Sequence, residues 1–128
     1  MSEVTELKSL YTRLGGYDAI AAATDDLLER LTSDPQIGIY WRGHSKDSMK
    51  RDRQLIVDFL CEALGGPIIY RGRDMKTSHE GLNISENDWQ IFVKHTEATL
   101  DKIGVQGKER EEFLAAAASL KGDIVERA

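Results

Sequence analysis

The sequence predicts an all-α fold built from helices that follow one another along one short chain. Apolar residues recur at intervals of three and four positions in several stretches, which is the spacing of one buried helical face. The first four of these stretches end at glycine or just before proline, where helices commonly stop. No segment is a convincing strand, since Ile68-Ile69-Tyr70 is short and runs into a turn that contains glycine. We therefore expect helices and connections only.

Two helices are expected before Pro35. The first is short and ends at Gly15-Gly16. The second ends at Ser33-Asp34-Pro35, because the residue before proline is pushed out of the helical region. The apolar positions that define these two helices are Leu7, Leu10, Tyr11 and Leu14, followed by Ile20, Ala23, Leu27, Leu28 and Leu31.

A third helix is expected from Met49, after an open connection that begins at Pro35. It stops at Gly65-Gly66-Pro67, where two glycines and a proline follow one another. Its apolar stripe consists of Leu55, Ile56, Phe59, Leu60, Ala63 and Leu64. The segment 67–83, which comes next, is expected to lack regular structure.

The fourth helix has the best-marked start in the chain. Ser85 is followed three residues later by Asp88, which is the pattern of a capping box. Ile84 and Trp89 are placed as a hydrophobic staple around that cap, and Gly104 ends the helix. A last helix follows, with apolar positions Phe113, Ala117, Leu120 and Ile124.

Composition limits the classes of function. The chain has 128 residues, of which 41% are hydrophobic, so we expect one domain over residues 1–128. A net charge of -5 argues against nucleic acid as a partner. Cys61 is the only cysteine, which excludes an intramolecular disulfide. With no secretory start and no membrane-length apolar run, the protein is expected to be soluble and cytoplasmic, without a membrane partner.

Segment 67–83 carries the residue that indicates a function. A long connection in a small domain is usually functional or disordered. This one contains His79, and the cations Arg71, Arg73 and Lys76 precede it. A neutral imidazole can donate its Nε2 lone pair to iron, and cations suit anionic side groups, so a haem is a candidate ligand. The alternative is that His79 caps a turn and that the cations are solvated.

Several stretches match a known family in order and spacing over nearly the whole chain. They are Leu10-Tyr11-Thr12-Arg13-Leu14-Gly15-Gly16, Ser33-Asp34-Pro35, Leu64-Gly65-Gly66-Pro67, Tyr70-x-Gly72 and Met75-x-x-x-His79-x-Gly81-Leu82. Together they resemble the truncated haemoglobins, most closely the first (N-type) group. The resemblance implies a two-over-two helical sandwich around one haem b, with His79 as the proximal iron ligand. It also implies reversible binding of O2, CO or NO on the other side.

The chain departs from the family pattern on the distal side. Leu28 stands where members often have tyrosine, and Leu55 where some have a histidine that closes on the iron. Asp52 and Ile56 occupy positions that are frequently glutamine or another polar residue. An ionised Asp52 accepts hydrogen bonds but cannot donate one to bound O2.

Other residues are candidates for the missing distal donor. Tyr40-Trp41 replaces a family Phe-Phe pair, and both side chains carry a polar hydrogen. His44 lies in the connection 42–48, which is longer than usual, so it either folds over the pocket or stays exposed. The distal candidates are therefore Tyr40, Trp41, His44 and Asp52.

The resemblance and the helical phase together predict the residues that contact the cofactor. Arg73 and Lys76 are the candidates for the propionates, and the alternative is that both are solvated. The complete set is Leu28, Tyr40, Trp41, Met49, Asp52, Ile56, Phe59, Leu60, Arg73, Met75, Lys76 and Phe92.

Three classes of function remain open. The first is a gas-binding globin, with an NO dioxygenase reaction as an extension that needs an unidentified reductase. The second is a haem-based sensor, peroxidase-like or electron-transfer protein. The third is a haem-free helical interaction protein. A monomer or weak dimer is expected in each case.

Overall fold

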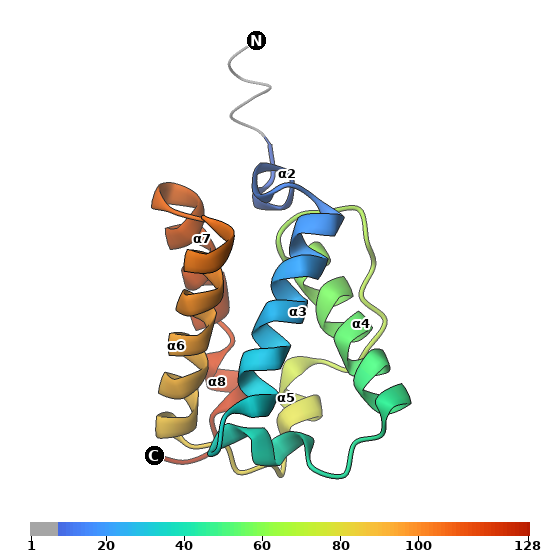
Figure 1. Ribbon diagram of the computed structural model, residues 1–128, viewed down its shortest axis with the longest axis vertical. Coiled ribbons are helices and arrows are strands. Elements are labelled where there is room, and N and C mark those ends of the chain that lie inside the picture. The colour runs from blue at the N-terminus through green and yellow to red at the C-terminus, as the bar shows by residue number, and fades with distance from the viewer. Residues whose placement is uncertain (1–7) are drawn as a thin grey trace.

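The computed structural model describes residues 8–128, and all its regular structure is helical apart from one isolated β-bridge between Ser85 and Arg127. The α-helices are α2 (Leu10–Leu14), α3 (Tyr17–Ser33), α4 (Lys46–Ala63), α5 (Met75–His79), α6 (Glu86–Ile103), α7 (Gly107–Ala118) and α8 (Lys121–Ile124). A 3-10 helix, η1, covers Ile37–Trp41 (Figure 1). The all-α prediction is confirmed, while Leu7 lies outside the described residues.

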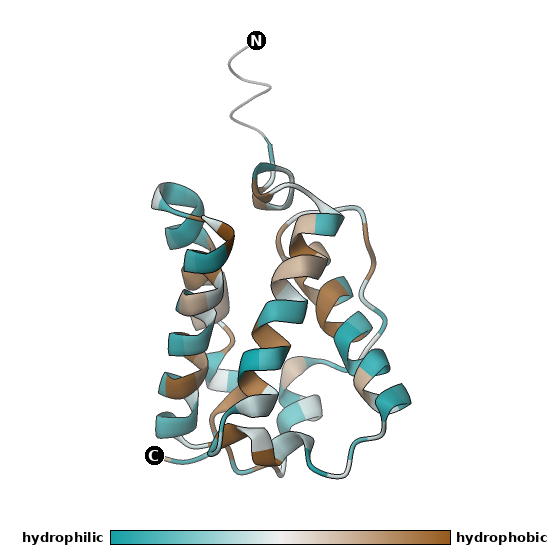
Figure 2. Ribbon diagram, viewed as in Figure 1, coloured by the Kyte–Doolittle hydropathy of each residue, from teal (hydrophilic) through white to brown (hydrophobic). Residues whose placement is uncertain are grey.

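The central helix of the fold is α3, which packs against α4 and α6 (Figure 1). Val57 and Cys61 on α4 are fully buried, and they meet Ile20 and Ala21 of α3. Apolar and polar residues alternate along the ribbons of both helices, as Figure 2 shows, because each buries one face and exposes the other. None of the helices in residues 8–128 combines the length and the apolar character that a membrane span requires.

The predicted helix ends are confirmed where local signals define them. Ser85 and Asp88 form both bonds of the capping box that opens α6. Gly104 closes α6 with φ of 77°, and Gly15 closes α2 with φ of 112°. Both values lie in the left-handed region, where glycine has no Cβ to clash.

The expected open connection between Pro35 and Met49 is wrong. It contains η1, and α4 begins at Lys46 with Ser45 as its cap. The carboxylate of Asp34 accepts the amides of Gln36 and Ile37 at 2.8 and 3.0 Å, which starts the 3-10 turn. Ile37 is then buried, so tertiary packing completes an element too short to show a helical period.

Two other expectations also need correction. The segment 67–83 contains α5, and the expected last helix is broken into α7 and α8. At the break, the hydroxyl of Ser119 donates to the Ala116 carbonyl at 2.6 Å, a local bond that competes with helix continuation.

Candidate functional site

His79 is the last residue of α5, and its ring is held in one orientation. Nδ1 lies 2.8 Å from the carbonyl oxygen of Met75, one turn earlier, and 3.0 Å from the hydroxyl of Ser78. A carbonyl oxygen can only accept, so Nδ1 carries the hydrogen and donates it to Met75. In the neutral ring, Nε2 therefore keeps its lone pair. This tautomer is the one that a metal-binding histidine uses when its other nitrogen is anchored to the backbone.

The segment before α5 is fixed to α4 through Tyr70. Its ring packs edge-on against Phe59, with centroids 5.3 Å apart, and its amide donates to Glu62 at 2.9 Å. The Tyr70 hydroxyl donates to the carbonyl of Arg73. A Cβ at Gly72 would collide with the Tyr70 ring, which explains the glycine in the Tyr70-x-Gly72 motif. The motif therefore holds the chain that delivers His79.

The segment after His79 is fixed by residues much further along the chain. Glu126 accepts the amide of Gly81 on Oε2 at 3.1 Å and the amide of Asn83 on Oε1 at 2.7 Å. These bonds join residues 45 and 43 positions apart. Sequence analysis missed Glu126, since no local pattern indicates a contact over that separation.

One face of α4 remains incompletely covered within the fold. Val57 and Cys61 are buried against α3, whereas the expected pocket residues on the adjacent face are half-buried. The half-buried members on this face of α4 are Met49, Asp52, Ile56 and Phe59, and Met75 and Phe92 share this intermediate exposure. Leu60, also expected in the pocket, packs instead against the core that α4 forms with α3. Apolar side chains in this state offer surface that a flat apolar ligand can bury.

The hydroxyl of Tyr40 is bound to a buried carboxylate. It donates to Oδ2 of Asp88 at 2.7 Å. Burial raises the pKa of the phenol to about 12, and the bond to Asp88 adds to the rise. The phenol hydrogen is thus committed to Asp88. The adjacent Trp41 is half-buried, and no acceptor for its indole is found among residues 8–128.

His44 and Asp52 form a pair between the connection and α4. Nδ1 of His44 lies 3.0 Å from Oδ2 of Asp52, and about a third of each side chain is exposed, at 34% and 32%. Among the described residues no partner is found for Nε2 of His44. The pair therefore places an imidazole with one free nitrogen beside the half-buried face of α4.

Arg53 is engaged by an ion pair with α3. It binds Asp25 on α3 through Nε at 2.8 Å and through a terminal nitrogen at 3.1 Å. This ion pair borders a cleft of about 570 Å³ between α3 and α4, lined by Asp25, Leu28, Met49, Lys50, Arg53 and Gln54. Leu28 is buried, so the cleft leads from solvent to two expected pocket residues, Leu28 and Met49.

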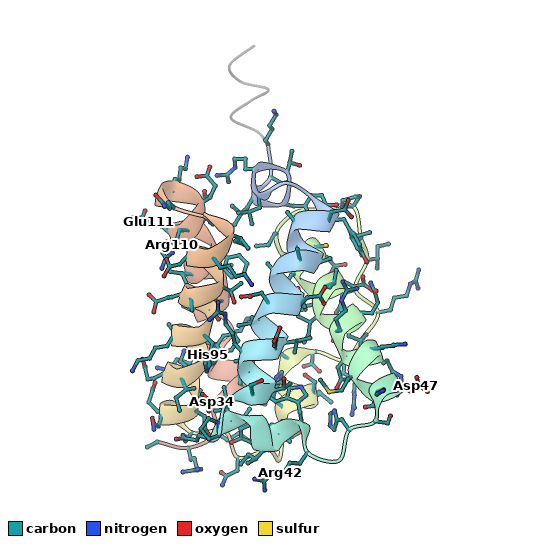
Figure 3. The ribbon with its side chains drawn as sticks, in the orientation of Figure 1. Asp34, Arg42, Asp47, His95, Arg110 and Glu111 are labelled. Atoms are coloured by element: carbon teal, nitrogen blue, oxygen red, sulfur yellow. The ribbon has the colours of Figure 1, made fainter. Side chains whose placement is uncertain are left out.

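Arg73 and Lys76, the expected propionate contacts, lie at the surface. Both are exposed near α5, and no ion pair involving either is found in residues 8–128. His95 is placed differently: its Nε2 lies 2.8 Å from Asp34, which joins α6 to the end of α3 (Figure 3). Of the three histidines, only His79 thus has an Nδ1 that is anchored to a backbone carbonyl.

The all-helical fold, in which α3 packs against α4 and α6, is that of the truncated globins. The chain belongs to the truncated haemoglobins, since the model of the bacterial-like globin family matches residues 9–126. A group 1 truncated hemoglobin from Chlamydomonas moewusii is 33% identical over 91% of this chain and 68% of that protein. Another from Mycolicibacterium paratuberculosis is 30% identical, covering 93% and 85%.

A solved structure supports the fold. The truncated hemoglobin of Tetrahymena pyriformis in its Fe(III) form superimposes with a TM-score of 0.84 and 24% identity, covering 92% of this chain and 98% of that one. The expected two-over-two helical sandwich and the expected likeness to group 1 are both confirmed.

Proposed function

We propose that the protein binds one haem b through Nε2 of His79 and reversibly binds O2, CO or NO on the opposite side. The observation that carries this proposal is the 2.8 Å contact between His79 Nδ1 and the Met75 carbonyl. It fixes the tautomer in which Nε2 holds a lone pair, so the ligand is ready without rearrangement.

The other residues fit the same group. Ile56, Phe59 and Phe92 supply apolar surface for a flat ring. Arg73 and Lys76 lie shortly before His79 in the sequence, and we propose that they meet the propionates at the rim of the ring. When bound, haem iron supplies a coordination position for a diatomic ligand. The protein residues then orient the proximal imidazole, exclude water from the apolar face and donate or withhold hydrogen bonds on the distal side.

The distal donor is proposed to be Trp41 or His44. Leu28 and Ile56 have no polar hydrogen, and the Tyr40 phenol is already bound to Asp88. His44 is held by Asp52, which leaves its Nε2 free to accept or carry a proton. If neither residue donates, hydrogen bonding to bound O2 is weak, and O2 loss and autoxidation are faster than in members with a distal tyrosine.

A peroxidase-like function is the second candidate, and one observation favours it in part. The His44–Asp52 pair supplies the base that peroxide chemistry requires. Peroxide chemistry also requires a cation near the bound peroxide, and the candidate cation, Arg53, is already paired with Asp25. Gas binding, with an NO dioxygenase reaction and a partner reductase as its extension, therefore remains first. One cytoplasmic domain that is a monomer or weak dimer completes the proposal.

Titration of the protein with haemin tests haem binding. The wild type is expected to take up one equivalent and to give a sharp Soret band. His79→Ala is expected to lose that band or shift it, while His95→Ala serves as the matched control and keeps it. Wild-type uptake that is weak and without an end point would favour the haem-free interaction protein instead.

A further inference from the structure

The helix that carries His79 cannot hold its own position. α5 has five residues, none of them buried, and the Asp74 side chain makes no capping bond. Helices this short are not stable alone in water, because nucleation is costly and few bonds repay it. Bonds inside α5 hold the ring of His79, but the position of α5 itself must come from contacts with other elements.

Those contacts come from residues near the C-terminal end of the sequence, namely α8 and Glu126. α8 packs against α5, as Figure 1 also shows. Directly after α8, the Glu126 carboxylate accepts the amides of Gly81 and Asn83, one on each oxygen. Gly81 and Asn83 have φ of 85° and 59°, so both lie in the left-handed region. Asn83 is the one described non-glycine residue there, and such a conformation persists when bonds hold it.

Arg127 also binds the loop that follows His79. Its Nε donates to the carbonyl of Asn83 at 3.0 Å, and the Ile84 carbonyl accepts the amide of Glu126 at 2.8 Å. The Arg127 carbonyl in turn accepts the amide of Glu86, the first residue of α6, at 3.0 Å. The loop after His79 is thus tied to the start of α6 through residues 126 and 127.

The chemistry of Glu126 suits this task. Hydrogen bonds from Gly81 and Asn83 lower the pKa of its carboxyl group, so it is ionised at neutral pH and both oxygens accept. Hydrogen bonds to an ionised acceptor are shorter and stronger than neutral ones. A glutamine at this position would offer one accepting oxygen instead of two.

We infer that Glu126 is a positioning residue for His79: its carboxylate holds the loop 81–83 and thereby fixes the orientation of the proximal imidazole. The inference rests on the proposed role of His79 as the iron ligand. Glu126 itself touches neither the ring nor the ligand that the ring would bind.

The apoprotein provides the first test, because it needs no haem. In Glu126→Ala, amide hydrogen exchange at Gly81 and Asn83 is expected to rise roughly tenfold or more, and His79 nitrogen shifts should show mixed tautomers. Glu126→Gln should fall between this variant and the wild type. Glu111→Gln, an exposed glutamate on α7 (Figure 3), is the matched control and should change neither. Wild-type exchange and a single tautomer in both Glu126 variants would overturn the inference.

The haem-bound protein provides the second test. The iron–histidine stretching band of the ferrous form should shift or broaden in Glu126→Gln and more in Glu126→Ala. Arg13→Ala breaks the Arg13–Glu112 pair, which joins α2 to α7, and controls for general loss of stability. It should leave the band unchanged. An unchanged band in Glu126→Gln would overturn the inference even if Glu126→Ala fails to fold. Failure of the wild type to bind haem would instead reject the proposed function, and the apoprotein arm would still decide whether Glu126 orients His79.

Discussion

The hydroxyl of Tyr40 donates a 2.7 Å hydrogen bond to Asp88, across a separation of 48 residues. Asp88 also accepts the side-chain amide of Gln36 at 2.8 Å and the backbone amide of Ser85 at 3.0 Å. One buried carboxylate therefore joins η1 to the first turn of α6. This arrangement fixes Tyr40 and holds η1, which also contains Trp41, against α6.

Tyr40→Phe is expected to affect stability and not ligand release. It removes a bond to a buried carboxylate, so the free energy of unfolding should fall by about 1.5–3 kcal/mol in urea titrations. The rate of O2 dissociation should match the wild type, because the phenol hydrogen points to Asp88. Trp41→Phe is the comparison, and faster O2 release in it would assign the donor to the indole. Faster release in Tyr40→Phe with unchanged stability would contradict this interpretation.

Stability is expected to fall in acid because of Asp88. Burial would raise the pKa of this carboxyl, but bonds from Gln36, Tyr40 and Ser85 outweigh burial and lower it to about 2, from an ordinary value of 3.8. A lowered folded-state pKa stabilises the protein above the ordinary value. That contribution, about 2 kcal/mol, is lost as the pH falls from about 4 to 2.

Unfolding experiments across this pH range measure the effect. Asp88→Asn should be less stable at neutral pH and should show a shallower loss in acid. Asp26, whose pKa is also lowered to about 2, chiefly by its bond to Arg30, remains in this variant and sets the residual slope. A slope equal to that of the wild type would mean that Asp88 does not contribute.

Arg53→Ala should speed the association of CO with the ferrous protein. The Arg53–Asp25 pair borders the cleft that reaches Leu28 and Met49, so removing the side chain widens that route. The change in stability should be at most about 1 kcal/mol, since the pair is exposed. Lys50→Ala is the control within the same cleft. Flash photolysis gives the rates, and equal rates in all three proteins would show that ligands enter elsewhere.

Leu28→Tyr is expected to restore a distal donor. Leu28 is buried at the floor of the cleft, at the position where family members often carry tyrosine. A new hydrogen bond to bound O2 should slow its dissociation by about tenfold, which corresponds to roughly 1.4 kcal/mol. Leu28→Phe adds a ring without the hydroxyl and controls for the change in volume. If both variants slow O2 release equally, hydrogen bonding is not the cause.

The sequence predicted the elements whose ends are encoded locally. The capping box at Ser85 and the stops at Gly15, Ser33 and Gly104 all appear where expected. It did not predict η1, because that short helix depends on Asp34 and on the burial of Ile37. Nor did it predict α5, which packs against α8 and is followed by a loop that Glu126 holds.

The candidate site divides in the same way. His79 followed from a motif of nearby residues, whereas the tautomer of its ring depends on the Met75 carbonyl in the folded helix. Tyr40 was one of four distal candidates, but its hydroxyl is bound to Asp88, which is remote in sequence. Periodicity and motifs therefore locate the side chains, and long-range hydrogen bonds decide what each can do.

The decisive test of His79 as the iron ligand is a set of absorption spectra of the reconstituted ferrous protein, with and without CO. We expect the wild type to give the spectrum of histidine-ligated ferrous haem, CO to shift its Soret band sharply, and His79→Ala to abolish the histidine-ligated form. If His79→Ala leaves the wild-type spectrum unchanged, another residue holds the iron and His79 is not its ligand.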